Sequence, residues 1–428
     1  MSLSATPEEQ RLREEAFRDL KRNYLAYLFH GLLGQTGMRL INAPTFVPAY
    51  VYALSGSDLI VGLARSLQYF GMFLSPILGA TLVEHRRRVL PLAFWVGGAM
   101  RLQILGLAAT GLFFPSHWAL FAVLAFLGLF GFFLGMQGVI FSTIFAKVIP
   151  VERRGILLGF RNSLSGLTAA AVAYLGGRYL VAGNVFGDGF GATFALAFVL
   201  TSLGLGMLFF VREPEPVHVR HRSSVRERLG DLPDLLKSDP AFTYYFVSRS
   251  LATMGRMALP FYFLYAYGRM GVEEGTALGV LSVVFLVAQT VSNGAWGWLA
   301  DRGGFRGVFL IALAIWIAAG VWLMQADGLV GTGVAFAGIG AGLGGFMLSA
   351  QNMVLEFGER HDLPLRIAVS NSASEFTGAI GPLVGGVLVV LGSYTTVFWT
   401  AIGFQVCAAI VVIAFVEEPR QRGRDSTQ

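Results

Sequence analysis

Long apolar runs alternate with short polar segments along almost the whole chain. The first group of runs covers about 25–52, 59–83, 89–110, 118–146, 155–182 and 190–211. After a polar segment at 212–240, a second group covers about 241–267, 277–300, 307–326, 331–358, 364–391 and 396–416. Each run approaches or exceeds the roughly 20 residues that a helix needs to cross a bilayer. The pattern predicts an all-α integral membrane protein with twelve transmembrane helices.

The composition supports a membrane protein and excludes several other classes. Hydrophobic residues make up 55% of the chain, charged residues only 14%, and the mean hydropathy is +0.63. The sequence contains no phosphate-binding loop that ends in lysine, no Cys/His cluster with metal-ligand spacing and no hydrolase motif. We therefore expect neither an enzyme nor a bound cofactor or metal. The net charge of +6 is spread over many loops, so we expect no nucleic-acid partner either.

Lys and Arg residues mark one side of the predicted membrane region. They occur in 1–24, 84–88, 147–154, 212–240, 301–306, 359–366 and 417–428, whereas Arg269 is the only one in the loops on the other side. Because basic loops remain in the cytoplasm, we predict a multi-pass inner or plasma membrane protein with both termini cytoplasmic. Residues 1–24 lack the apolar core of a signal peptide. Their apolar residues share one helical face, which predicts an amphipathic segment on the membrane surface.

The two groups of runs repeat each other in sequence. The segment 128–137 aligns with 342–351, and 162–168 aligns with 371–377. Phe210-Val211-Arg212-Glu213-Pro214 returns as Phe415-Val416-Glu417-Glu418-Pro419. Gly176-Gly177 likewise returns as Gly385-Gly386. Chance similarity among Gly- and Phe-rich helices is the alternative, but all four matches occur in the same order. They predict two pseudo-symmetric six-helix bundles, 25–211 and 241–416, joined by a cytoplasmic linker at 212–240 and followed by a tail at 417–428.

A short charged turn separates two of the runs in the second half. It reads Gly297-Trp298-Leu299-Ala300-Asp301-Arg302-Gly303-Gly304-Phe305-Arg306. Glycines allow a tight reversal, and the arginines hold the turn on one side of the membrane. The pattern resembles the signature loop of the major facilitator superfamily. The resemblance extends over the whole chain and implies a transporter whose two bundles rock about a central site.

The family has a second signature, the antiporter motif, besides the charged loop, and neither is complete in both halves of this chain. The first half keeps Gly79 and Arg87-Arg88 of the loop but has Val83 at the acidic position. The segment 381–386 resembles the core of the antiporter motif, which drug exporters carry on their fifth helix rather than on the eleventh. The sequence therefore resembles the superfamily and none of its subfamilies in particular.

Polar side chains inside the predicted spans are candidates for a substrate site. A charged group at this depth costs about 2.5–3.5 kcal/mol, so it faces a cavity or a partner. Hydrogen bonding between helices is the competing role. We expect Arg65 and Arg178 to reach toward the membrane surface and Arg101 to have a structural role. The candidates for substrate binding are Gln35, Arg39, Asn42, Gln137, Arg256, Gln289, Asn293 and Gln351.

Two of these candidates point to an anionic substrate. Arg39 and Arg256 occupy matched places on the first helix of each half, within Gly37-Met38-Arg39 and Met254-Gly255-Arg256. Pseudo-symmetry brings them to two sides of one site, where guanidinium groups bind oxyanions through paired hydrogen bonds. Arginines inside the spans outnumber the acidic residues, which are Glu356 and Glu375. The arrangement resembles the organophosphate/phosphate antiporters of the superfamily, and it implies anion binding.

Two further roles follow from the acidic residues. Glu375 is placed near the middle of the eleventh helix, where its pKa would respond to burial and to a nearby arginine. We predict that it couples transport to protons, with a static ion pair as the alternative. Asp301, Arg302, Arg306 and Glu356 lie where helices leave the membrane and are predicted to form a cytoplasmic gate.

The sequence leaves three classes of function open. The first is a secondary active transporter of a small organic anion. The second is a proton-coupled exporter of amphiphiles or lipids, favoured by the aromatic residues of the seventh helix, which are Phe261, Tyr262, Phe263, Tyr265 and Tyr267. The third is a membrane receptor or assembly factor that does not transport. In each case we expect a monomer in the lipid bilayer, and for a transporter we expect protons as the candidate coupling ion.

Overall fold

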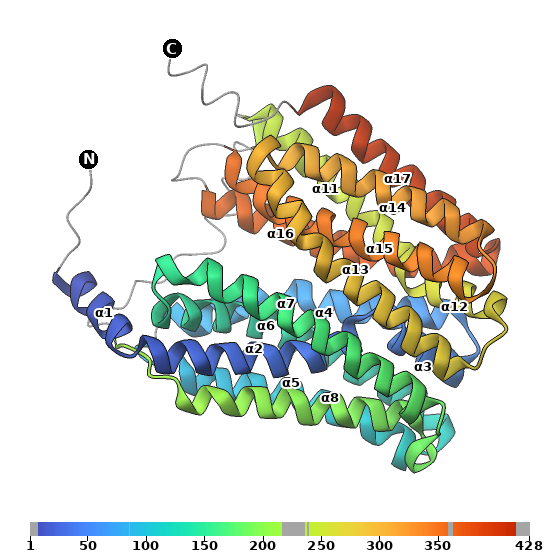
Figure 1. Ribbon diagram of the computed structural model, residues 1–428, viewed down its shortest axis with the longest axis horizontal. Helices are drawn as coiled ribbons and strands as arrows, with labels where there is room; N and C mark the ends of the chain where they lie inside the picture. Colours follow the sequence, from blue (N-terminus) through green and yellow to red (C-terminus); the bar gives the residue numbers. More distant parts are fainter. Residues whose placement is uncertain (1–6, 85, 216–235, 238, 358–362, 417–428) are drawn as a thin grey trace.

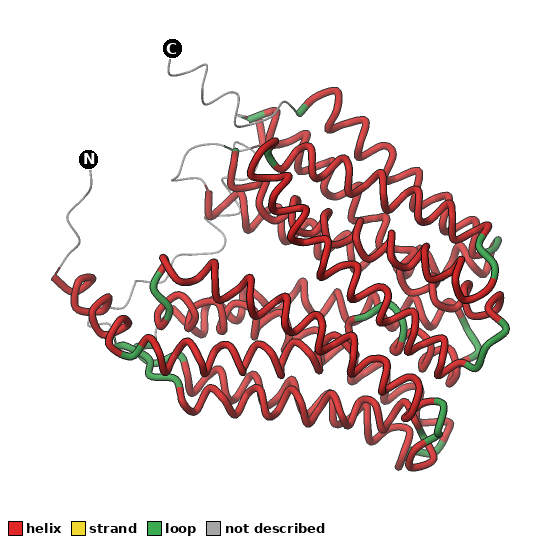
Figure 2. The backbone as a smooth tube through the Cα atoms, in the orientation of Figure 1, coloured by secondary structure: helices red, strands yellow, loops and turns green. Residues whose placement is uncertain are grey.

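The computed structural model describes residues 7–84, 86–215, 236–237, 239–357 and 363–416 (Figure 1). Within these ranges the chain is helical with short connections, as Figure 2 shows. The first long helix begins at Leu20 and the last one ends at Phe415, both at the same end of the molecule. We call this the terminal end, and we call the other one the opposite end.

The first half contains α1 (Pro7–Arg18), α2 (Leu20–Asn42), α3 (Phe46–Ser55), α4 (Asp58–Glu84), α5 (Leu90–Phe113), α6 (Ser116–Val148), α7 (Val151–Leu175) and α8 (Gly189–Gly206). The π-helical turn η1 (Gly176–Val181) continues α7, the short turn η2 (Val185–Gly187) follows it, and the 3₁₀ turn η3 (Met207–Phe210) continues α8.

The second half contains α11 (Pro240–Met254), η4 (Gly255–Ala258), α12 (Leu259–Met270), α13 (Glu274–Gly303), α14 (Phe305–Gln325), α15 (Gly328–Asn352), η5 (Met353–Glu356), α16 (Leu363–Leu391) and α17 (Tyr394–Phe415). The signature turn is as tight as expected, because Gly304 reverses the chain between α13 and α14 with a φ of +78°, which favours glycine.

Ten of the described helices are long and apolar enough to cross a membrane. The first and seventh spans are the exceptions, and each is made of two shorter helices in line. In the first span, Ala43 is extended because it precedes Pro44, so α2 ends and α3 begins afresh. In the seventh, the 3₁₀ turn η4 separates α11 from α12, which has Pro260 in its first turn. With these two broken spans the fold has the predicted twelve.

Two packed groups of helices correspond to the two sequence repeats (Figure 1). Within the first, α4 packs on α6 and α2 packs on α7 and α8; within the second, α14 and α13 pack on α15, and α11 packs on α17. The halves meet along two matched pairs of helices, α4 with α16 and α7 with α13. The two contacts are equivalent under the internal repeat, because α4 corresponds to α13 and α16 corresponds to α7.

Glycines bring the halves close together toward the opposite end. A Cβ at Gly177 would collide with the backbone of Gly275 and Gly279, and a Cβ at Gly62 would collide with the carbonyl of Pro382. Small residues allow such backbone contact between membrane helices. Toward the terminal end α7 and α13 diverge (Figure 1), and a Cβ at Gly155 or Gly297 would meet nothing within 4 Å. The halves are therefore joined at the opposite end.

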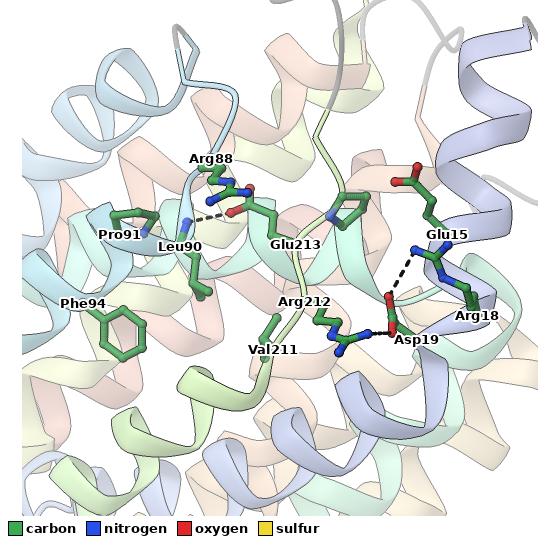
Figure 3. A pocket seen from close by; sticks show the side chains of 11 residues that line it. Glu15, Arg18, Asp19, Arg88, Leu90, Pro91, Phe94, Val211, Arg212 and Glu213 are labelled. Carbon is green, nitrogen blue, oxygen red and sulfur yellow. Dashed lines mark hydrogen bonds and ion pairs between the residues drawn. The ribbon is translucent and has the colours of Figure 1, made fainter.

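Polar contacts tie together several segments of the first half at the terminal end (Figure 3). Glu213 has a side chain only 3% exposed; it accepts from the backbone N–H of Val89 and Leu90 at the start of α5 and pairs with Lys147 at 2.8 Å. Arg212 pairs with Asp19 at 3.1 Å. These contacts fix the position at which the chain leaves α8. Most of the predicted linker at 212–240 lies outside the described residues, as does the tail at 417–428.

Candidate functional site

A cavity of about 290 Å³ lies between the two halves, next to both helix breaks. Its polar wall consists of Arg39, Asn42, Arg65, Tyr69, Arg256 and Gln289. Its apolar wall includes Met72, Leu134, Leu259, Phe285, Leu286, Leu343 and Met347. Because α2, α4 and α6 meet α12, α13 and α15 here, both repeats contribute to one site.

The broken helices place the two matched arginines at this cavity. Arg39 lies one turn before the break in the first span, and its Nη1 donates to the hydroxyl of Thr290 on α13, 3.3 Å away. Arg256 lies in η4, where its guanidinium carbon is 4.4 Å from the centre of the Tyr69 ring on α4. Each arginine therefore reaches from its own half to a residue of the other half.

Glu375 lies on α16, one turn before Gly378, which faces the Arg256 guanidinium. The side chains of Glu375 and Arg256 interact electrostatically. The Oε2 atom of Glu375 is buried and has no hydrogen-bond partner among the described residues. A buried carboxylate oxygen without a partner is costly, so Arg256 is the nearby charge that offsets this burial.

Arg65 behaves differently from our expectation that it reaches toward the membrane surface. Its side chain is 3% exposed, donates to the carbonyl of Ala43 at 2.6 Å and to Oε1 of Gln68 at 2.8 Å, and lines the cavity. The expectation was wrong because the break in the first span leaves the Ala43 carbonyl without its helical partner, and a guanidinium satisfies it. The polar spacing of Arg65, Gln68 and Tyr69 on one face of α4 was the signal that could have revealed this wall.

The structure brings together only some of the predicted substrate residues. Arg39, Asn42, Arg256 and Gln289 line the cavity. Asn293 lies one turn farther along α13, and both it and Gln289 face Gly344 of α15. Gln35 instead bonds to α7, where Ser165 donates to it at 2.7 Å.

The remaining two candidates lie away from the cavity. Gln137 accepts a hydrogen bond of 3.2 Å from Arg101, which also donates to the carbonyls of Gly97 and Thr201. This is the structural role that we expect for Arg101. Gln351 is exposed near the terminal end of α15. Although the repeat makes Gln137 and Gln351 equivalent, the first is buried and the second is exposed.

The predicted gate residues lie together at the terminal end. Arg302 lies over the ring of Trp298, 3.9 Å from its centre. Arg306 donates to the carbonyls of Val412 and Ile413 in the last turn of α17, at 3.4 and 3.3 Å. Asp301 is exposed at the end of α13, and Glu356 ends η5.

A family model of the Major Facilitator Superfamily matches residues 28–276 and 271–428. Among solved structures, a mutant form of the nucleoside transporter NupG is similar with a TM-score of 0.72 at 13% identity, covering 93% of this chain and 100% of that chain. A D-xylose-proton symporter is similar with a TM-score of 0.72 at 15% identity, covering 94% and 98% of the two chains. A search of curated proteins finds no match.

Identities this low show that the fold is shared, and they give no information about the substrate. The family match is broader evidence, because its two segments together cover nearly all of the two repeats. The twelve spans, their division into two halves and the cavity between them all agree with it. The chain belongs to the major facilitator superfamily and is a membrane-embedded protein with the fold of its transporters.

Proposed function

We propose that the protein is a secondary active transporter that moves a small organic anion by alternating access. One observation carries the proposal: three guanidinium groups, those of Arg39, Arg65 and Arg256, line a cavity between the halves. In the part of the chain that the structure describes, the carboxyl group of Glu375 interacts with one of them, Arg256. In surroundings of low dielectric constant this excess of positive charge favours an anion.

The hydrogen bonds of the three arginines leave donors available for an oxyanion. Among the described residues Arg39 bonds only to Thr290, at 3.3 Å, and Arg256 contacts the Tyr69 side chain. A guanidinium group has five N–H donors and no acceptor. Carboxylate, sulfonate and phosphate groups match this set because they accept paired hydrogen bonds.

The orientation that we propose places the terminal end in the cytoplasm. Arg86, Arg87, Arg88 and Lys147 lie at this end, whereas Arg269 lies at the opposite end. Basic residues accumulate on the cytoplasmic side of membrane proteins. Because the halves are joined at the opposite end, this conformation would be closed to the outside and able to exchange ligand with the cytoplasm.

Export of amphiphiles or lipids receives less support from the site. That alternative rested on the aromatic residues of the seventh span. Phe261 and Phe263 are fully buried, Tyr262 is 3% exposed, and none of the three is among the residues that line the cavity. They pack the second half instead of forming a binding surface.

The proposed function is tested by ligand stabilisation and by uptake. Purified protein in detergent is heated in the presence of organic anions, neutral compounds of the same shape, and cations. We expect anions to raise the melting temperature, and proteoliposomes to take up the most effective anion. Stabilisation by cations alone would overturn the anionic substrate. Stabilisation without any uptake would instead favour the receptor class.

Glu375 is proposed to carry the coupling proton. Replacing Glu375 with glutamine is expected to abolish accumulation of substrate driven by a proton gradient, because the amide cannot take up and release a proton at this site. Exchange of substrate across the membrane without a gradient is expected to persist, since the arginines remain. Proteoliposome uptake with an imposed pH gradient measures the accumulation, and counterflow measures the exchange.

Glu274→Gln is the matched control for this experiment, because Glu274 begins α13 and is not among the residues that line the cavity. It is expected to behave like the parent protein. If the Glu375→Gln protein still accumulates substrate against its gradient, Glu375 forms only a static ion pair with Arg256.

Asp301, Arg302, Arg306 and Glu356 are proposed to close the terminal end in the outward-facing state. There Asp301 would meet the start of α7, where a carboxylate favours the positive end of the helix by about 0.3–1 kcal/mol. Asp301→Asn is therefore expected to shift the balance toward the present conformation by about two- to fivefold. Labelling of a cysteine at the exposed position of Ser163, in a Cys407→Ser background, measures the shift. Asp327→Asn, at the opposite end, is the control, and equal labelling rates in both variants would rule out the gate.

A further inference from the structure

Three polar side chains form a continuous hydrogen-bonded chain at the break in the first span. Arg65 Nη1 donates to Gln68 Oε1 at 2.8 Å, and Gln68 Nε2 donates to Asn42 Oδ1 at 2.8 Å. Arg65 is 3% exposed and Gln68 is 1% exposed, whereas Asn42 is exposed at the wall of the cavity. The chain thus runs from the interior of the first half to the ligand site.

The direction of every bond in this chain is fixed by chemistry. Arginine can only donate, so the atom of Gln68 that faces Arg65 must be its oxygen. The amide nitrogen of Gln68 must then face Asn42, and the atom that it meets must be the oxygen of Asn42. These two bonds determine the orientation of both amides. The Nδ2 group of Asn42 is left over, and it bonds to no other described residue.

The broken helix holds this chain in place. Arg65 Nη2 also donates to the carbonyl of Ala43 at 2.6 Å, which anchors the guanidinium to the residue next to Asn42. Arg39 and Asn42 are three residues apart on α2, so they share a face. At the break, the cavity is therefore bordered by the donors of Arg39, Asn42 and Arg65.

We propose that Gln68 is a positioning residue that turns the donor of Asn42 toward the ligand and so restricts this end of the cavity to groups that only accept hydrogen bonds. Deprotonated carboxylates, sulfonates and phosphates are such groups. A hydroxyl or primary amide of similar shape must donate as well, and at a wall of donors its own hydrogen is left without a partner. An unpaired buried donor of this kind is a strong basis for rejection. The proposal rests on the anionic substrate proposed above and adds the residue that enforces it.

Gln68→Glu is the decisive variant, because it reverses the direction of the hydrogen bond between residue 68 and Asn42. A glutamate has nearly the same shape but can only accept, so it takes a bond from Arg65 and a second one from Asn42 Nδ2. Asn42 then has to turn, and its oxygen faces the cavity. The expected result is an exchange of preference: benzoate binding weakens by about tenfold or more, and binding of benzamide, which can donate, becomes stronger.

The experiment measures binding by thermal stabilisation and calorimetry on the full-length protein in detergent. The probes are benzoate, benzenesulfonate and phenyl phosphate, with benzamide and benzenesulfonamide as neutral counterparts. Added negative charge alone would weaken anion binding and leave benzamide unchanged, so the gain in benzamide binding separates the two effects. In an Asn42→Leu background, Gln68→Glu is expected to produce no such gain, because the amide through which it acts is missing.

The outcomes distinguish the two proposals. A parent protein that responds to none of the anions, or prefers the neutral compounds, overturns the anionic substrate itself. A parent protein that prefers anions, together with a Gln68→Glu protein of unchanged benzamide affinity, overturns the role of Gln68 alone. If Gln68→Glu does not fold, Gln68→Met serves instead. It frees the Asn42 amide to rotate and is expected to reduce the preference for benzoate over benzamide, whereas an unchanged preference counts against the role of Gln68.

Discussion

Replacing Arg39 or Arg256 with alanine is expected to reduce anion affinity by at least about 30-fold. Removing one partner of a desolvated charged pair costs about 2–5 kcal/mol, and each 1.4 kcal/mol corresponds to a factor of ten in Kd. The cost arises because the bound anion would remain in the cavity without its donor. Lysine at either position keeps the charge but loses the fork of paired donors, so about a tenfold loss is expected.

Calorimetry with the best anion from the stability screen measures these losses. Arg269→Ala is the matched control: Arg269 donates to the carbonyl of Met324 at the opposite end, and it does not line the cavity. It is expected to bind like the parent. Parent-like affinity in both Arg39→Ala and Arg256→Ala would contradict the proposed anion site.

Replacing Gly177 with valine is expected to open the opposite end of the molecule. A side chain there would collide with the backbone of Gly275 and Gly279 across the contact between the halves. Overpacking of a tight contact costs about 1–3 kcal/mol. Because the contact is expected only while this end is closed, the cost changes the ratio of the open to the closed conformation by about 5- to 150-fold.

Labelling of a cysteine at Ser282, which is fully buried here, reports the shift when a membrane-impermeant reagent is added from outside. The Cys407→Ser background removes the native thiol. Gly403→Val on α17 is the control, since a Cβ there would meet nothing within 4 Å. Unchanged labelling of the Gly177→Val protein, together with normal uptake, would show that this contact does not hold the end closed.

The sequence predicts the fold because its signals are local. Apolar length sets each span, so the run at 59–83 and helix α4 (Asp58–Glu84) agree within a residue at each end. The reversal at Gly304 was equally visible, because a turn this tight needs residues without a side chain. The two-fold relation of the repeats also accounts for the two equivalent contacts between the halves, α4 with α16 and α13 with α7.

The site was only partly predictable, because a polar residue in a membrane helix can face either a cavity or a polar group of an adjacent helix. Gln137 and Gln289 look alike in sequence, yet the first accepts from Arg101 and the second faces the cavity. The difference depends on the side chain that the adjacent helix presents. Arg65 was missed for the same reason: the carbonyl that it binds becomes available only because the first span breaks at Pro44.

The two broken spans also bear on how the chain enters the membrane during synthesis. Among the described helices, the segments of the first and seventh spans are not long and apolar enough to cross a bilayer alone. Each carries an arginine near its break, and at the first break a side chain of a neighbouring helix satisfies the Ala43 carbonyl. Stable insertion of the first span therefore depends on α4, which follows it and supplies Arg65 to the Ala43 carbonyl. We therefore expect the earliest unit to integrate into the bilayer to be a helical hairpin, and a ribosome-bound chain that ends before α4 to leave its first span weakly inserted.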